Sequence, residues 1–389
     1  MRDRYDIIVV GGGPSGSMAA RSAAESGASV LLLEKDREIG IPVRCAEGVG
    51  ELGLKSVVDV DPKWITKEII GATFYSPSGH VVRIKTDEVG YVLNRKLFDY
   101  DLAQRAAAKG AEIITRAYVH DLLHEDGYVS GVRVKHLGKE YSIKAKVVIG
   151  ADGVESRVGR WAGLKTKTSM RDMETCAQFT AANIDLDDNY CHFYFSRRIA
   201  PGGYLWVFPK GNGMANVGLG ISGEFAAVRS PYDYLNEFFQ QHFPQAAILT
   251  TVVGGVPCAP PLQEMVADGL MLVGDAAHQA NPVSGGGIVT GMLAGKIAGQ
   301  VAAEAIAKGD TGKNQLKKYV KQWLKAGGQK NKLFYNIKKY VYNLTDEDLD
   351  QLAEILNDMP EEKRTILTLF KKALVKKPSL IMDAIKVFT

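Results

Sequence analysis

The feature that most constrains this chain is a glycine-rich turn that follows an apolar run at its start. Residues 7–10 are typical of a buried parallel strand, and Gly11, Gly13 and Gly16 follow in the spacing G-x-G-x-x-G. In a βαβ unit the first glycine permits a tight turn, the second lets the backbone approach a pyrophosphate, and the third lets the helix pack closely. Ser15 lies in the same turn, at the start of a helix whose free N–H groups attract phosphate. The sequence therefore predicts a dinucleotide site.

An acidic residue follows the next apolar run. Glu34 comes directly after residues 30–33, where a carboxylate accepts hydrogen bonds from ribose hydroxyls. A carboxylate there disfavours a 2′-phosphate, so the adenosine half is expected to belong to FAD or NAD rather than NADP. Because strand, helix and acid stand in this order, we favour a dinucleotide site over an ordinary glycine turn.

A second segment of this kind, with a strand, an acidic residue and a glycine-rich helix start, occurs late in the chain. Residues 269–275 read as a short buried strand that ends in Gly-Asp, and glycines at 285–287 precede an alanine-rich helix to about residue 307. NAD needs only one such unit, whereas the longer FAD is commonly held from two sides. We expect Asp275 to bind the ribityl hydroxyls, and the N–H groups of Gly287 and Ile288 to face the isoalloxazine edge.

Together with a third strand that ends in Asp152, these segments resemble the FAD-binding fold of the p-hydroxybenzoate hydroxylase type. Within that fold, residues 201–209 (PGGYLWVFP) are similar to the P-x-x-Y-x-W-x-F-P signature of the geranylgeranyl reductase family. Residues 44–48 (RCAEG) are similar to the cysteine-bearing loop of that family. The resemblance runs from residue 4 to about residue 308. The FAD motifs identify the fold only, since many monooxygenases share them, whereas the aromatic segment is much more specific.

The resemblance implies a reductase with non-covalent FAD that saturates the C=C bonds of geranylgeranyl chains on archaeal glycerophospholipids. Besides the residues above, it implies cofactor contacts by Cys45, Ala46, Gly48, Arg95 and, near the adenine, Val119. It implies substrate contacts by Pro201, Tyr204, Trp206, Phe208 and Pro209. Catalytic roles fall to Cys45, Tyr204 and Trp206.

The aromatic residues of this segment alternate along a predicted strand. Tyr204, Trp206 and Phe208 should therefore face one side. Their rings would stabilise positive charge that develops on an alkene during protonation, by about 0.5–2 kcal/mol per ring. From the residues alone, ordinary core packing is the better explanation; with the family resemblance we favour a pocket. Cys45 either contacts the flavin or is a small buried hydrophobic residue.

For three polar residues near the FAD motifs we expect structural rather than catalytic roles. We expect His278 to be a loop histidine that bonds to the backbone rather than an acid. Asp152 and Arg157 are expected to brace the FAD-binding domain.

The pattern of elements predicts a mixed α/β (α+β) protein. A Rossmann-like FAD-binding domain would comprise residues 1–70, 90–165 and 265–310, and an antiparallel-sheet substrate domain residues 71–89 and 166–264. Residues 311–389 would form a basic helical region. The expected strands cover residues 179–184, 191–195, 204–209 and 214–221, with a hairpin over 117–134. The expected helices cover residues 97–109, 230–243, 316–325, 331–342, 345–356 and 361–377.

The charge of the chain is concentrated in the last of these regions. The net charge is +4, yet residues 311–345 hold nine lysines and no Asp or Glu. An anionic lipid surface, nucleic acid and simple solvation all account for such a segment. Given a lipid substrate we favour lipid and expect no nucleic acid partner. Basic residues there, such as Lys338 or Lys371, are candidates for the substrate phosphate.

The chain has no apolar run of about 18 residues and no predicted signal peptide. We therefore expect a cytoplasmic enzyme at the cytoplasmic face of the cell membrane. The four cysteines lack C-x-x-C spacing and are expected to be reduced thiols, and no metal site is expected.

Two other functions remain open at this point. One is an FAD-dependent monooxygenase or halogenase of the same fold, and the other is a flavin-containing lipid-binding or electron-relay module without turnover. The external electron donor is also open among NAD(P)H, ferredoxin and a reduced deazaflavin, because the sequence contains no second dinucleotide fingerprint.

Overall fold

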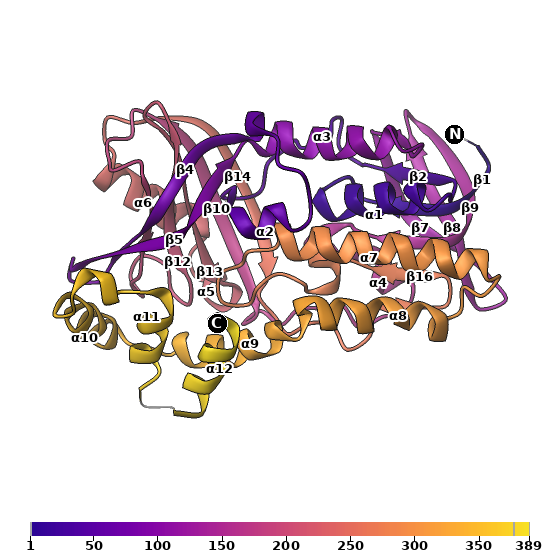
Figure 1. Ribbon diagram of the computed structural model, residues 1–389. Coiled ribbons are helices and arrows are strands. Elements are labelled where there is room, and N and C mark those ends of the chain that lie inside the picture. The colour runs from indigo at the N-terminus through magenta and orange to yellow at the C-terminus, as the bar shows by residue number, and fades with distance from the viewer. Residues whose placement is uncertain (1, 376–377, 389) are drawn as a thin grey trace.

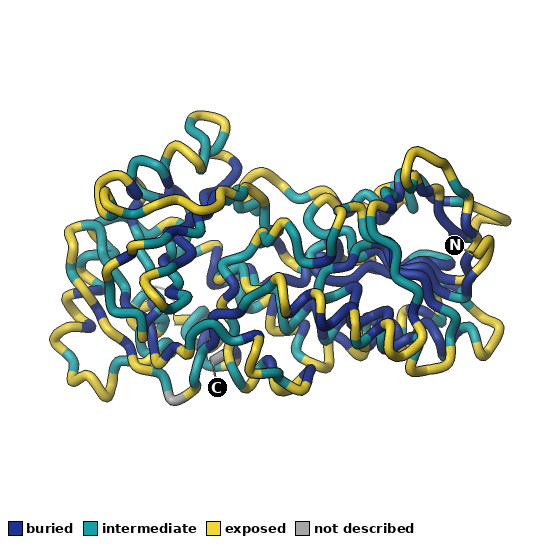
Figure 2. The backbone as a smooth tube through the Cα atoms, turned by 90° about the horizontal axis from the view of Figure 1, so that it is seen from above, coloured by how far each residue is buried: buried dark blue, intermediate teal, exposed yellow. Residues whose placement is uncertain are grey.

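Two eight-stranded sheets stand at opposite ends of the molecule in a computed structural model, which describes residues 2–375 and 378–388 (Figure 1). The first sheet has a parallel centre and an antiparallel edge strand, and its strands are largely buried (Figure 2). Its order is β15 (Val266–Ala267), β16 (Leu270–Leu272), β9 (Lys139–Gly150), β1 (Arg4–Val10), β2 (Val30–Leu33) and β6 (Glu112–Ile114). The hairpin of β7 (Ala117–Glu125) and β8 (Tyr128–His136) joins it antiparallel to β9, with the turn at Asp126-Gly127 as predicted.

The predicted βαβ unit is present. The glycine turn connects β1 to α1 (Pro14–Glu25), which packs against α7 (Ile288–Ala307) and α3 (Arg95–Ala107). Gly11 has a φ of +107°, and a Cβ there would lie 2.3 Å from the Ala151 carbonyl oxygen. A Cβ at Gly16 would lie 1.9 Å from the Gly11 carbonyl oxygen. Both positions therefore exclude any larger residue.

The second sheet contains the four predicted strands and several more. Its order is β14 (Ala247–Pro257), β10 (Met173–Ala182), β13 (Met214–Ser222), β12 (Tyr204–Gly211), β11 (Tyr190–Tyr194), β4 (Ile65–Tyr75), β5 (Val81–Leu93) and β3 (Gly48–Gly50). The predicted antiparallel sheet is present, with one departure, since β11 pairs with β4 in parallel. The sheet also takes a longer N-terminal piece than residues 71–89, since β4 and β5 begin and end beyond them.

The two faces of the second sheet differ. One face packs on α6 (Pro231–His242) through a core that includes Leu205, Val207 and Phe239. The other face carries the side chains of Tyr204 and Trp206. The remaining short helices are α2 (Glu51–Lys55), α4 (Arg157–Trp161) and α5 (Gly223–Ala226).

The C-terminal region is helical, as predicted; its first helix lies along α7 beside the first sheet, and its later helices lie below the second sheet in Figure 1. It comprises α8 (Lys313–Trp323), α9 (Lys330–Val341), α10 (Asp346–Asn357), α11 (Ile366–Ala373) and α12 (Pro378–Phe388). The helix predicted for residues 361–377 begins later, because the Thr365 hydroxyl accepts the Thr368 N–H and caps it. Its predicted end at residues 376–377 lies outside the described residues. Pro378 starts a further helix that was not predicted. Among the described residues, no helix has the length and apolar character to span a membrane.

Candidate active site

One cavity of about 1010 Å³ connects the two sheets and the C-terminal helices. Loops of the first sheet contribute Ser15 and Asp275, and the open face of the second sheet contributes Trp206. Leu352 on α10 and Leu369 on α11 line the distal end. Glycine-rich polar loops therefore lead into a long apolar chamber.

Most of the predicted cofactor-binding residues line the end of this cavity that the loops of the first sheet form. The lining includes Gly13, Ser15, Gly16, Cys45, Ala46, Gly48, Arg95, Asp275, Gly287 and Ile288. Gly11 shapes the turn behind them. Glu34 is also outside the lining, and its carboxylate accepts the N–H groups of Gly12 at 2.7 Å and Asp36 at 2.9 Å. Val119 is buried in the core of the first sheet and does not line this cavity.

Asp275 has the surroundings that an FAD hydroxyl site requires. It lies at the end of β16, and its Oδ1 is 3.2 Å from where a Cβ of Gly287 would stand. Within the described part of the chain, no side chain or N–H group donates a hydrogen bond to its carboxylate. Burial raises the pKa of Asp275 to about 6, an effect that the Arg95 charge opposes. A half-buried carboxylate with free acceptor positions fits the ribityl hydroxyls of FAD.

This carboxylate gives FAD binding a defined pH dependence. Hydroxyl groups donate to the ionised form, so FAD should bind the carboxylate more tightly than the carboxylic acid. The Kd for FAD is therefore expected to fall as pH rises from about 5 to 7, and to level off above the pKa near 6. Titration of the apoprotein by calorimetry across this range measures it. The Asp275→Asn variant should bind more weakly at pH 7 and without this dependence; an unchanged pH profile in the variant would contradict the assignment.

A buried ion pair holds the cysteine-bearing loop. Glu47 has a φ of +74°, and its side chain is 6% exposed. Its carboxylate pairs with Lys210 and accepts the Arg95 N–H at 2.8 Å and the Asn216 amide at 2.6 Å. Cys45 Sγ in turn accepts the Glu47 N–H at 3.2 Å. Burial raises the pKa of the Cys45 thiol, against the lowering effect of Arg95, so a neutral thiol faces the cavity.

In the aromatic segment every second side chain lines the cavity, namely Tyr204, Trp206 and Phe208. Leu205 and Val207 are buried on the opposite face, as period two requires. The Trp206 indole covers Gly218, where a Cβ would stand 2.6 Å from the ring. The Trp206 Nε1–H donates to the Gln178 side chain at 3.0 Å, and Gln178 donates to the Cys45 carbonyl at 2.9 Å.

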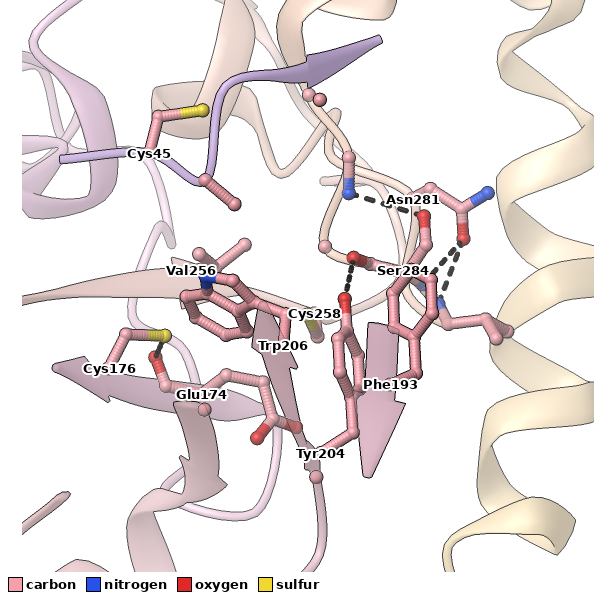
Figure 3. A pocket seen from close by; sticks show the side chains of 18 of the residues that line it. Cys45, Glu174, Cys176, Phe193, Tyr204, Trp206, Val256, Cys258, Asn281 and Ser284 are labelled. Atoms are coloured by element: carbon pink, nitrogen blue, oxygen red, sulfur yellow. Dashed lines mark hydrogen bonds between the residues drawn. The ribbon is translucent and has the colours of Figure 1, made fainter. Parts of the chain in front are cut away.

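Tyr204 ties the same strand to the second flavin loop. Its hydroxyl donates to the Ser284 carbonyl at 2.6 Å (Figure 3). Phe193 on β11 stands next to Tyr204 and Phe208, with ring centroids at 5.7 and 5.4 Å. The aromatic wall is therefore connected to both loops that are expected to flank the flavin.

Two residues of the aromatic signature do not take part in the cavity. Pro201 and Pro209, expected to contact substrate, are buried and absent from its lining. Pro209 lies two residues after Val207 on β12, so it faces the core on the same side as Leu205 and Val207. Pro201 lies in the turn before β12, where its carbonyl accepts the Ser222 N–H.

The structure adds three residues that the sequence did not single out and gives Lys338, a candidate for the substrate phosphate, other partners. Glu174, Cys176 and Gln178 alternate on the cavity face of β10, and Lys338 approaches from α9. Period two along β10 could have grouped the first three. Nothing local could have placed Lys338, which is buried against Glu174 and Asp172 instead of offered to a phosphate. All four cysteines, though scattered in sequence, line this cavity.

The observed contacts agree with the structural roles expected for His278, Asp152 and Arg157. His278 is buried outside the cavity lining, its Nε2 donates to the Thr166 carbonyl at 3.2 Å, and burial lowers its pKa. Asp152 accepts the Val158 N–H at 3.0 Å, and Arg157 donates to the Tyr118 hydroxyl. No group of three or more His, Cys, Asp or Glu side chains in the described ranges could hold a metal.

Comparison with known proteins agrees with this geometry. Residues 172–256 match the model of the geranylgeranyl reductase catalytic domain, and residues 6–201 match that of FAD-dependent oxidoreductases. The digeranylgeranylglycerophospholipid reductase of Methanosarcina mazei is 47% identical over 98% of this chain and 96% of its own length. Digeranylgeranylglycerophospholipid reductase 2 of Methanococcoides burtonii is 45% identical over 100% of this chain and 97% of its own length.

Solved structures give the same result. A geranylgeranyl bacteriochlorophyll reductase-like protein from Thermoplasma acidophilum superposes with a TM-score of 0.91 at 36% identity, covering 99% of this chain and 100% of the other. A flavin-dependent brominase superposes with a TM-score of 0.70 at 20% identity, covering 97% and 99%. At that identity the likeness to the brominase shows the fold alone.

Proposed function

We propose that this chain, which belongs to the geranylgeranyl reductase family and is an FAD-dependent oxidoreductase, saturates the C=C bonds of geranylgeranyl chains on archaeal glycerophospholipids. The observation that supports the proposal most is the continuous cavity, which begins at the Asp275 loop, passes Trp206 and ends among apolar side chains of α10 and α11. A prenyl chain needs such a long apolar chamber next to the flavin. The names of the two methanogen relatives supply the phospholipid.

The residues of the chain have separate tasks in this proposal. FAD, when bound, supplies the hydride. Asp275 and the turn at Gly13 hold the cofactor, while Tyr204 and Trp206 line the path of the prenyl chain and favour positive charge on it. The Tyr204 and Gln178 hydrogen bonds fix the wall relative to both flavin loops. An external donor, which we place among NAD(P)H, ferredoxin and reduced deazaflavin, restores the reduced cofactor.

The test is anaerobic. Purified protein with FAD is reduced with dithionite and mixed with digeranylgeranylglycerophospholipid, and flavin reoxidation and lipid mass are followed together. We expect reoxidation with mass gains in steps of two hydrogens. Reoxidation only after oxygen is admitted would favour a monooxygenase or halogenase, whose fold the brominase shares. Bound lipid with no mass change would favour a module without turnover.

We also propose that the enzyme works at the cytoplasmic face of the membrane. The supporting observation is a set of exposed lysines on α8, α9 and the turn between them: Lys317, Lys321, Lys325, Lys330, Lys332 and Lys339. Tyr319 and Trp323 on α8 are buried against the first sheet, so neither side chain is available to a lipid surface. We expect co-flotation with vesicles that contain anionic lipid, lost at high salt. Equal binding to neutral vesicles would contradict an electrostatic contact.

A further inference from the structure

The cavity wall contains an acidic side chain that its ion pair satisfies only in part. Glu174 lies on the cavity face of β10, and its side chain is 12% exposed. Its Oε1 is 3.3 Å from the Lys338 ammonium, while its Oε2 is buried without a hydrogen-bond partner. A buried, half-satisfied carboxyl costs stability. Such a group in an apolar chamber indicates a function.

The position of Glu174 is on the substrate wall rather than among the cofactor loops. It shares the wall with Tyr204 on β12 (Figure 3), and the two side chains are close enough for the Glu174 charge to raise the pKa of the Tyr204 hydroxyl. Cys176 stands two residues further along the same face of β10. Glu174, Cys176 and Tyr204 all line the cavity.

We propose that Glu174 is the proton donor for reduction of the prenyl double bond. The inference rests on the proposed function. In this step the O–H bond of the Glu174 carboxylic acid breaks and a C–H bond forms at one alkene carbon, while the other carbon receives the hydride that reduced FAD supplies. The product is the saturated bond, oxidised FAD and the Glu174 carboxylate, which then takes a proton from water.

The other carboxyl groups, three of the thiols and Tyr204 are less suited to this role. Asp275 is the cofactor ligand, and Glu47 is held by Lys210. Burial raises the pKa of the Cys45, Cys176 and Cys258 thiols, so their acidity is too low for efficient proton transfer at neutral pH. Burial likewise raises the pKa of Tyr204, whose proton is directed at Ser284.

The surroundings of Glu174 adjust its acidity. Burial raises the pKa of Glu174 to about 7, and the Lys338 charge opposes the rise. Asp172, which precedes β10, adds a raising effect and is 3.7 Å from the same ammonium. The remaining titratable groups near it are Cys176, Cys258, Tyr204 and Tyr342. Lys338 therefore acts as a positioning residue that keeps the pKa of Glu174 near neutral pH.

The experiment compares single-turnover flavin reoxidation by the phospholipid in the FAD-loaded full chain between pH 5.5 and 9. In the wild type the rate should fall as pH rises through about 7, because the acid is lost. Glu174→Gln should be slower by about 100-fold or more and lose that pH limb, since general acids contribute roughly 10²–10⁴-fold. Glu174→Asp should recover part of the rate, and Lys338→Met should move the limb to higher pH. Glu68→Gln, an exposed carboxyl on β4, is the matched control and should behave as the wild type.

A second readout does not depend on turnover. Carbon-13 NMR of glutamate-labelled protein without FAD should show one carboxyl that titrates near pH 7 and disappears in Glu174→Gln. An active wild type with an undiminished Glu174→Gln rate overturns the proton donor alone. A wild type that reduces no prenyl lipid overturns the proposed function, and the proton donor with it.

Discussion

Replacing Gly16 by alanine is expected to abolish FAD binding and to destabilise the protein. The new Cβ would stand 1.9 Å from the Gly11 carbonyl oxygen and 3.1 Å from the Ala151 side chain. These atoms belong to the turn itself and to the loop after β9, so no flexible side chain can move aside. Helix α1 must shift away from the turn, and its N–H groups then leave the phosphate position. We expect a loss of about 3 kcal/mol in the free energy of unfolding.

Gly13→Ala is the informative comparison. A Cβ at Gly13 meets no protein atom within 4 Å, because that space is open in the chain alone. This variant should fold with unchanged stability as the apoprotein but bind FAD weakly, since the methyl group occupies the path of the pyrophosphate. Thermal unfolding of both apoproteins and flavin absorbance after purification test the pair. Retained FAD in Gly16→Ala would show that the turn does not bind the dinucleotide.

Replacing Lys210 by methionine is expected to cost about 3–5 kcal/mol, because it leaves the Glu47 carboxylate buried without its counter-charge. The two side chains are 11% and 6% exposed, so water cannot substitute for the ammonium. The Lys210 ammonium also donates to the Leu93 carbonyl at 3.0 Å, and that bond is lost too. Because Glu47 orients the Arg95 N–H, the loop of Cys45 should loosen and FAD affinity should fall with stability.

Chemical denaturation of the variant measures the effect, and two further variants make it interpretable. Lys67→Met breaks a more exposed pair with Asp188 and should cost below about 1 kcal/mol. Adding Glu47→Gln to Lys210→Met removes the unpaired charge and should recover part of the loss. A Lys210→Met cost no larger than that of Lys67→Met would show that the buried pair does not hold the loop.

The cofactor end of the site was largely readable from the sequence. The glycine spacing and the two strand–acid–helix segments depend on local backbone geometry, which nearby residues determine. Gly11, Gly16 and Asp275 accordingly stand where the motif requires them. The alternation of Tyr204, Trp206 and Phe208 likewise follows from strand periodicity, although only the sheet decides which face is open.

The substrate end was less readable, because its residues come from segments far apart in the chain. Pro201 and Pro209 belong to the same signature yet face away from the cavity. The parallel pairing of β11 with β4 joins residues more than 100 positions apart, and no local pattern indicates it.

By itself, the sequence determined the dinucleotide turn, the alternating aromatic strand and the helical character of the C-terminal region, since each depends on residues within one or two turns or strands. Only the tertiary structure decided that Lys338 of a basic helix lies buried beside Glu174, and that four scattered cysteines line one cavity. Those placements depend on how separate elements pack, and the burial that raises the pKa of Glu174 exists only once those elements have come together. The chemistry proposed for the cavity therefore belongs to the fold rather than to any motif.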